Sequence, residues 1–295
     1  MIDNNAKIFV TGHRGILGRA LMGELGRRGF AAVGVDVAEV DITDAGRLRA
    51  ILERETPDVV VNCAAFTRVD ECEERRDLCF DVNAGGAGTV AAEAAEVGAR
   101  VIHIGTDYVF DGRARGPYGE DAETGPLSVY GESKLEGERL VAEAAADHLI
   151  VRTASLFGLG GVSFVSKILT RAKNGESLRV VEDQRCSPTY AAHLAEALAA
   201  LLHVEYRGIV NVVNAGSATW FEVAREILKL TGNDVPLEPV ATADLDLPAP
   251  RPAYSVLSIS RFTGLTGHVM PTWQEGLAAY LRELKEVKEV RADAD

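Results

Sequence analysis

Short apolar runs alternate with longer amphipathic segments along the first half of the chain. The runs lie at 7–10, 31–35, 59–61, 100–104 and 149–151, and few polar residues interrupt them. Strands that are apolar throughout are typical of a parallel sheet covered on both faces. Because segments of helical length separate the runs, the pattern predicts an α/β fold with a doubly wound, Rossmann-like parallel sheet.

Helical periodicity occupies most of the remaining sequence. Helices are expected at 19–28, 45–55, 70–97 with a break near 85–86, 129–146, 164–173, 190–202, 220–230 and 273–285. Two later apolar runs, at 178–181 and 209–213, are expected to be strands. A proline-rich stretch at 236–252 precedes the last helix, and the charged tail at 286–295 is expected to be frayed.

The alternation of strand and helix loosens after about residue 155, which indicates a change of organisation. We expect a dinucleotide-binding domain at 1–155, with returning sheet elements near 187–213. Segments 156–186 and 214–295 are expected to form a smaller, discontinuous substrate-binding domain. A chain of 295 residues is long enough for two close-packed domains of this kind.

The charge balance and the cysteines restrict the class of protein. The formal net charge is −13, so we expect no nucleic-acid or anionic-membrane partner, since both require a basic surface. No apolar run reaches the length of a membrane span, and the first residues lack the features of a signal peptide. The four cysteines show no CxxC spacing and the six histidines no His-x3-His pair, so we expect a cytoplasmic protein without a metal site.

A glycine-rich turn follows the first strand and opens the first helix. Gly12 permits a tight turn, Gly15 leaves room for a pyrophosphate, and Gly18 lets the helix press on the sheet. The helix N-terminus then offers free N–H groups to the phosphates. The turn therefore predicts a dinucleotide cofactor, held by Gly12, His13, Arg14, Gly15, Ile16, Leu17 and Gly18.

The end of the second strand bears on which dinucleotide binds. Asp36 lies 18 residues after Gly18, where a carboxylate accepts hydrogen bonds from the adenosine ribose and repels a 2′-phosphate. Arg14, in the turn, instead suits a 2′-phosphate. The two signals conflict, so both NADH and NADPH remain candidates.

Tyr130 and Lys134 are the strongest candidates for chemistry. Four residues apart in a predicted helix, they share one face. A nearby ammonium favours the phenolate and lowers the pKa of a phenol toward the working range. Thr106 follows the apolar run at 100–104, at the carboxyl edge where open α/β sheets bind ligands. A lone Tyr-x3-Lys pair is often a surface pair, but with Thr106 and the glycine turn it predicts proton transfer to or from a carbonyl or alcohol oxygen.

Longer blocks of sequence carry a family resemblance. They lie at 41–44, 61–70, 105–112, 126–134, 183–189 and 251–255. The most specific are Thr-Asp-Tyr-Val-Phe at 106–110 and Asp-Gln-x3-Pro-Thr at 183–189. Over nearly its whole length the chain resembles the dTDP-4-dehydrorhamnose reductase family of extended short-chain dehydrogenases/reductases.

The resemblance implies an NADPH- or NADH-dependent reduction of the C4 keto group of a nucleotide-linked 4-keto-6-deoxysugar, converting dTDP-4-dehydro-L-rhamnose to dTDP-L-rhamnose. It makes Thr106, Tyr130 and Lys134 the catalytic set. It also places cofactor contacts at Asp41 and Ile42, beside the adenine, and at Cys63, Ala64 and Ala65, beside the ribose. Substrate contacts are implied at Thr67, Val69, Thr106, Asp107 and Tyr108.

Some positions depart from the family or leave alternatives. Tyr108 replaces a glutamate of the related 4,6-dehydratases, which favours reduction over dehydration. Ser155 replaces a family tryptophan on the substrate side, which leaves a different nucleotide sugar open. Arg185 and Arg251 suit the substrate diphosphate, because guanidinium groups match phosphate oxygens, with surface ion pairs as the alternative.

Two further alternatives concern assembly and class. Some family members dimerise around a magnesium ion held by glutamates, but Ala20 and Ala192 stand at the matching positions. We therefore expect a monomer or homodimer without that metal. The regulatory β subunit of methionine adenosyltransferase shares these motifs, so a non-catalytic, cofactor-binding role is the alternative from another class.

Overall fold

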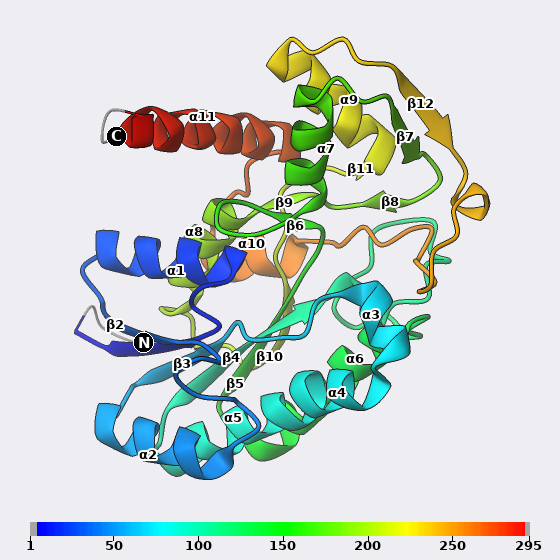
Figure 1. Cartoon of the computed structure of the whole chain (residues 1–295). Coiled ribbons are helices and arrows are strands. Elements are labelled where there is room, and N and C mark those ends of the chain that lie inside the picture. The colour runs from blue at the N-terminus through cyan, green and yellow to red at the C-terminus, as the bar shows by residue number, and fades with distance from the viewer. Residues whose placement is uncertain (1–4, 293–295) are drawn as a thin grey trace.

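The computed structural model describes residues 5–292, and its centre is a six-stranded parallel sheet (Figure 1). The strands, in spatial order, are β10 (Gly208–Asn211), β5 (His148–Thr153), β4 (Arg100–Thr106), β3 (Val59–Asn62), β1 (Lys7–Thr11) and β2 (Ala31–Val35). Every neighbouring pair is parallel. The predicted doubly wound parallel sheet is thus confirmed, and the apolar run at 209–213 contributes its edge strand.

Helices cover both faces of the sheet, as Figure 1 shows. One face carries α1 (Ile16–Arg27) and α8 (Ala191–Leu201), and the other carries α2 (Ala45–Glu55), α5 (Ala87–Glu96) and α6 (Val129–Ala144). Along β3, Val59 and Val61 pack toward α1 and α8, and Val60 packs toward the helices on the opposite face. Because successive strand residues point to opposite faces, a strand covered on both sides has no polar alternation.

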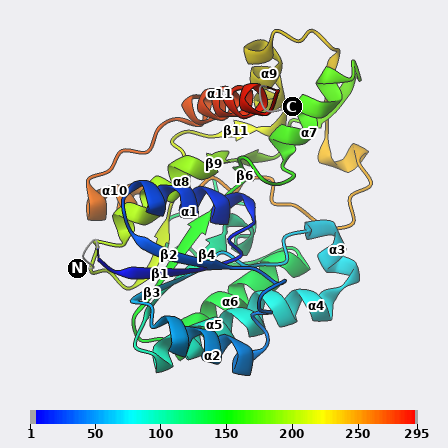
Figure 2. The same ribbon diagram turned by 60° about the vertical axis from the view of Figure 1, so that its left-hand side comes forward.

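A separate group of elements lies above the sheet, on the side of α1 and α8, with an apolar core of its own (Figure 2). Its helices are α7 (Phe164–Lys173), α9 (Trp220–Thr231) and α11 (Trp273–Ala292). Three two-stranded ribbons accompany them, namely β6 (Leu156–Phe157) with β9 (Thr189–Tyr190), β8 (Arg185–Cys186) with β11 (Ala218–Thr219), and β7 (Leu178–Val181) with β12 (Leu237–Val240). Ile168, Ile227 and Leu277 bring the three helices together in this core.

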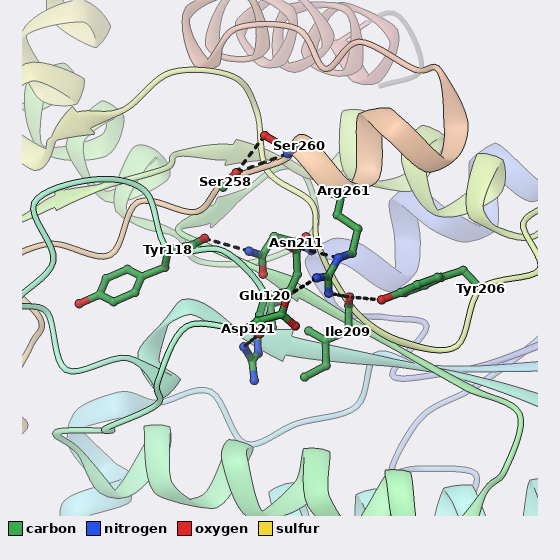
Figure 3. Close-up of polar contacts among 10 residues, drawn as sticks. Tyr118, Glu120, Asp121, Tyr206, Ile209, Asn211, Ser258, Ser260 and Arg261 are labelled. Atoms are coloured by element: carbon green, nitrogen blue, oxygen red, sulfur yellow. Dashed lines mark hydrogen bonds and ion pairs between the residues drawn. The ribbon is translucent and has the colours of Figure 1, made fainter.

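Polar contacts tie the edge strand β10 to two distant segments (Figure 3). Arg261, on the short helix α10 (Ser260–Thr266), donates to the carbonyl oxygen of Ile209 at 3.1 Å and to Asp121 at 2.5 Å. Asn211 donates its side-chain amide to the carbonyl oxygen of Tyr118 at 3.0 Å. The loop before α6 is therefore held against the sheet by groups that are far from it in sequence.

The structure corrects several predicted boundaries. The segment at 70–97 breaks into α3 (Val69–Glu74), α4 (Arg76–Phe80), the π-helical turn η1 (Asp81–Gly86) and α5, so the first break comes at Arg75 rather than near 85–86. The proline-rich stretch contains the strand β12. Its Pro239 is tolerated because β12 pairs on one side only and needs no N–H from that residue.

The predicted frayed tail is also wrong over most of its length. Helix α11 continues to Ala292, seven residues beyond the expected end at 285, and residues 293–295 lie outside the described part of the chain. Leu281 and Leu284 pack against the upper core. Because they are three residues apart, they share one helix face and extend its apolar contact.

Candidate active site

A cavity of about 390 Å³ opens at the carboxyl edge of the sheet. Its walls come from the glycine turn, the loop after β3, the end of β4, helix α6 and the loop after β5. The predicted residues that line it are Gly12, Gly15, Ile16, Leu17, Gly18, Cys63, Ala65, Thr67, Thr106, Asp107, Tyr130, Lys134 and Ser155. One cavity thus brings together the three predicted catalytic residues and the glycine turn.

The glycine turn packs so closely against neighbouring backbone that side chains at Gly12 and Gly18 would collide with it. Gly12 has a φ of 66°, and a Cβ there would lie 2.7 Å from the backbone nitrogen of Ala64. A Cβ on Gly18 would collide with the Gly12 carbonyl oxygen, and Gly15 stands at the N-cap of α1. The first turn of α1 therefore opens onto a bare backbone cradle, which fits the pyrophosphate of a dinucleotide.

Charged groups meet beside this cradle. The carboxylate of Asp36 accepts the backbone N–H of Arg14 at 3.1 Å. The guanidinium of Arg14 is paired with Glu39, which also accepts the backbone N–H of Asp36 at 2.9 Å. In the sequence, Asp36 and Arg14 gave opposite signals for NADH and NADPH. Glu39 also bears on that choice, because it offsets the charge of Arg14.

The other predicted cofactor residues lie outside the cavity lining. The ring of His13 covers Gly34, where a Cβ would lie 2.6 Å from its Cγ. Asp41 accepts the backbone N–H and the hydroxyl of Thr43, at 3.0 and 2.8 Å. Ile42 is buried, and the backbone N–H of Ala64 bonds to buried side chains. Their predicted cofactor contacts remain predictions.

Thr106 and Tyr130 lie together in the wall of the cavity. The Thr106 hydroxyl accepts the backbone N–H of Tyr108 at 3.3 Å and lies 3.2 Å from the Asp107 carboxylate. The Tyr108 ring meets the Tyr130 ring edge-on, with 5.6 Å between centroids. These contacts hold the phenol and the strand-end hydroxyl at one point of the wall.

The pKa of Tyr130 differs from the sequence-based prediction. Lys134 was expected to lower it, but desolvation of the phenol raises it well above its usual value. The Lys134 ammonium nitrogen instead faces the carbonyl oxygen of Ile104, at 2.7 Å, and Nε2 of His103, at 3.2 Å. Lys134 is only 2% exposed, and this burial lowers its own pKa to about 8.

Asp107 is a buried carboxylate with a free acceptor atom. Its Oδ2 is without a hydrogen-bond partner, and burial raises the pKa of the carboxyl to about 6 despite bonds to Ser255 and Thr106. Thr153, whose hydroxyl is likewise buried and unpartnered, lines the same cavity. Such orphaned polar atoms carry a desolvation penalty that ligand hydroxyls would relieve.

Replacing Asp107 by asparagine is expected to stabilise the protein above pH 6. A carboxyl whose pKa rises from 3.8 to about 6 on folding disfavours the folded state when charged. In the wild-type protein, the stability contributed by protonated Asp107 should be fully retained below pH 4 and lost as pH rises through 6. The free energy of unfolding should fall by about 2–3 kcal/mol in all. Chemical denaturation of both proteins between pH 4 and 8 measures this difference. A gap that does not change with pH would contradict the expectation.

The two arginines predicted for the diphosphate each have a carboxylate partner. Arg251 binds both oxygens of Asp70, at 2.7 and 2.8 Å, and reaches the phenol of Tyr108. Arg185 lies 3.1 Å from Glu222. Neither arginine lines the cavity, and in the structure both form ion pairs, as the alternative interpretation expected. Their binding of the substrate diphosphate stays a prediction.

Val69 and Ser155, two other predicted substrate-binding residues, differ in their position relative to the cavity. Val69 begins α3, outside the cavity lining, so its role stays a prediction. Ser155 lines the cavity with a φ of 47°, a left-handed value that is uncommon outside glycine. The thiol of Cys186 donates to the Ala218 carbonyl oxygen at 3.7 Å, and burial raises its pKa to about 12, which does not suit a nucleophile.

The sequence predicted no role for His103, although its imidazole contacts Lys134, which is predicted to be catalytic. Its imidazole is fully buried within β4 and joins Lys134 to Asn62, at the end of β3. A usable signal existed, because a histidine within an otherwise apolar buried run needs a polar partner.

The described part of the chain, residues 5–292, bears on a metal site and on a membrane span. That part of the chain holds no group of three or more His, Cys, Asp or Glu side chains placed to bind a metal ion. Within the same range, no helix combines the length and the apolarity of a membrane span. Ala20 and Ala192 line a groove between α1 and α8.

Comparison with known proteins gives the family. The profile described as "RmlD substrate binding domain" matches residues 6–286. The chain is 39% identical to the spore coat polysaccharide biosynthesis protein SpsK of Bacillus subtilis, covering 94% of this chain and 97% of that protein. It is 41% identical to a dTDP-4-dehydrorhamnose reductase of Streptomyces griseus, covering 91% of each.

A solved structure supports the same assignment. The dTDP-4-dehydrorhamnose reductase of Bacillus anthracis in complex with NADP has a TM-score of 0.91 and 36% identity, covering 95% of this chain and 99% of that one. The resemblance seen in the sequence is therefore confirmed, and the chain belongs to the RmlD substrate-binding-domain family.

Proposed function

We propose that the protein is an oxidoreductase that uses NADPH or NADH to reduce the C4 keto group of a nucleotide-linked 4-keto-6-deoxysugar. The observation that carries this proposal is the meeting of Thr106, Tyr130 and Lys134 in the cavity that the glycine turn also lines. Relatives named dTDP-4-dehydrorhamnose reductase support it. The solved relative that contains NADP supports the cofactor class.

The protein's own groups supply the proton and the orientation. When bound, the reduced nicotinamide supplies the hydride. Tyr130 donates its proton to the developing alkoxide, and its raised pKa keeps the phenol protonated until then. Thr106, which lines the same cavity as that phenol, orients the carbonyl oxygen. In its protonated form, Lys134 stabilises the phenolate that forms on its own helix face.

The expected substrate is dTDP-4-dehydro-L-rhamnose, giving dTDP-L-rhamnose. Tyr108 supports reduction over dehydration, because it offers no carboxylate for acid–base work on the sugar ring. Ser155 supports the alternative of a different nucleotide sugar, since a hydroxyl replaces a large ring at the cavity wall. A Streptomyces niveus relative, 38% identical, is named dTDP-4-keto-6-deoxy-D-glucose reductase.

A panel of nucleotide 4-ketosugars, assayed with both reduced cofactors, tests the proposal. We expect oxidation of the cofactor with at least one dTDP-linked 4-keto-6-deoxysugar and recovery of the 4-hydroxy product. Tight cofactor binding without oxidation across the panel would refute the enzymatic proposal. It would favour the non-catalytic, cofactor-binding alternative, which a pull-down for a partner chain would then examine.

Replacing Glu39 by glutamine is expected to shift cofactor preference toward NADPH. The change frees Arg14 for a 2′-phosphate and removes one negative charge beside Asp36. Because these groups are partly exposed and screened, the ratio of kcat/KM for NADPH to that for NADH should rise about fivefold. Steady-state kinetics of this variant and of the exposed control Glu53→Gln measure the effect. An equal ratio in both variants would contradict the role of Glu39.

A further inference from the structure

A chain of buried polar side chains runs from β1 to the catalytic lysine. Thr11, Asn62, His103 and Lys134 are each at most 2% exposed. The Thr11 hydroxyl lies 2.6 Å from Oδ1 of Asn62, Nδ2 of Asn62 lies 3.2 Å from Nδ1 of His103, and Nε2 of His103 lies 3.2 Å from Nζ of Lys134. With so little water nearby, each donor needs an acceptor within the chain.

The first link determines how the Asn62 amide is oriented. The atom that faces Thr11 also receives the backbone N–H of Ala64, at 3.2 Å. A donor there would oppose that N–H, so the atom must be the amide oxygen. The 2.6 Å separation from the Thr11 hydroxyl fits an O–H···O bond. The amide NH₂ of Asn62 therefore donates toward His103.

The amide in turn determines the tautomer of His103. Since Nδ1 accepts from Asn62, the single proton of a neutral imidazole sits on Nε2. The doubly protonated form is disfavoured, because burial and the nearby lysine lower the pKa of His103 well below its ordinary value. An N–H group of the imidazole therefore points at Nζ of Lys134.

Only one protonation state of Lys134 is compatible with this N–H group. An ammonium has three donors and no acceptor, so it would oppose the imidazole N–H. A neutral amine accepts from Nε2 of His103 and still donates to the Ile104 carbonyl oxygen at 2.7 Å. The pattern of donors and acceptors thus favours the neutral amine.

Other ionisable groups around Lys134 act on it less directly. Glu138, on the same helix, would favour the ammonium, but its carboxylate is bound to Arg152 by bonds of 2.7 to 3.1 Å. The thiols of Cys63 and Cys79 also face the lysine, and burial raises the pKa of Cys63 to about 12. Tyr130, one turn before Lys134, stays protonated because its pKa is raised.

We propose that His103 is a positioning residue that stabilises Lys134 as a neutral amine in the free protein. Its direct contact adds to the effect of burial, which by itself lowers the pKa of Lys134 to about 8. Lys134 then gains and loses a proton near the working pH instead of remaining a permanent cation. The consequence for turnover rests on the proposed reductase function, but the protonation state itself does not.

Nuclear magnetic resonance of the unliganded wild-type protein tests the proposal without any turnover. The ¹⁵N shifts of His103 should show the Nε2–H tautomer, and the ¹³Cε shift of Lys134 should titrate with a midpoint below about 8, the value that burial alone gives. An Nδ1–H tautomer, or a Lys134 midpoint at or above about 8, would overturn it.

A variant of His103 separates the effect of the His103–Lys134 contact on the Lys134 midpoint from the effect of burial. In His103→Gln the side-chain carbonyl can turn toward Nζ and accept from the ammonium, so the Lys134 midpoint should rise by about one pH unit. The control His193→Gln removes a histidine that pairs with Asn214 at 2.8 Å, away from the cavity, and should leave that midpoint unchanged.

An unchanged midpoint in His103→Gln would contradict the proposal and leave burial as the sole cause. If that variant does not fold, the NMR measurement of the His103 tautomer in the wild-type protein decides whether the proposal holds. A protein that shows both expected NMR results yet reduces no ketosugar would refute the proposed function and keep this inference.

Discussion

Replacing Tyr130 by phenylalanine is expected to reduce kcat by about 10²–10⁴-fold, the usual contribution of a positioned proton donor. The variant keeps the ring that packs against Tyr108 but loses the phenolic hydroxyl that lines the cavity. Because only the proton donor disappears, the affinity for the reduced cofactor should change little. Single-turnover and steady-state assays with the active ketosugar measure the first effect, and cofactor titration measures the second.

The control for this prediction is Tyr206→Phe. The Tyr206 phenol makes a long, 3.5 Å contact to the Ile209 carbonyl oxygen at the sheet edge, outside the cavity. Its removal should leave kcat within about twofold, since a weak surface hydrogen bond contributes little. A Tyr130→Phe enzyme as active as this control would exclude Tyr130 as the proton donor.

Replacing Arg152 by methionine is expected to lower the free energy of unfolding by about 3–5 kcal/mol, because Glu138 would remain buried without its partner. The two side chains are 2% and 3% exposed and share bonds of 2.7 to 3.1 Å. Gly105 makes this contact possible, since a Cβ there would lie 2.5 Å from Oε1 of Glu138. The pair therefore fastens α6, which carries Tyr130 and Lys134, onto β5.

Chemical denaturation compares this variant with Arg139→Met on the same helix. Arg139 pairs with Glu136 and Glu143 on the exposed side, where such ion pairs contribute at most about 1 kcal/mol. The double variant Arg152→Met with Glu138→Leu should recover part of the loss, because no charge is then left buried. If Arg152→Met were no more damaging than Arg139→Met, the buried pair would not anchor α6.

Much of the architecture could be read from the sequence because it follows from local periodicity. The apolar strands, the spacing of the helices and the glycine turn each depend on residues within a few positions of one another. The meeting of Thr106 with Tyr130 was also predictable, because the carboxyl ends of parallel strands and the helices beside them share one edge of the sheet. The predicted domain boundaries remain a prediction.

Other features depend on contacts that join distant segments. The pairing of Arg251 with Asp70 spans 181 positions, and that of Arg14 with Glu39 crosses from the glycine turn to the loop after β2. Charge and spacing alone do not distinguish such ion pairs from phosphate-binding arginines. The continuation of α11 to Ala292 likewise required knowledge of what Leu281 and Leu284 touch.

By itself, then, the sequence determined the parallel sheet and the glycine turn, since these follow from short-range pattern and strand geometry, and it predicted the Thr106, Tyr130 and Lys134 set. Only the tertiary structure decided the protonation chemistry of that set. Burial raised the pKa of Tyr130 and lowered that of Lys134, and the lysine turned toward His103, a residue 31 positions away. Desolvation and donor–acceptor matching arise only when distant segments pack, so no local pattern contains them.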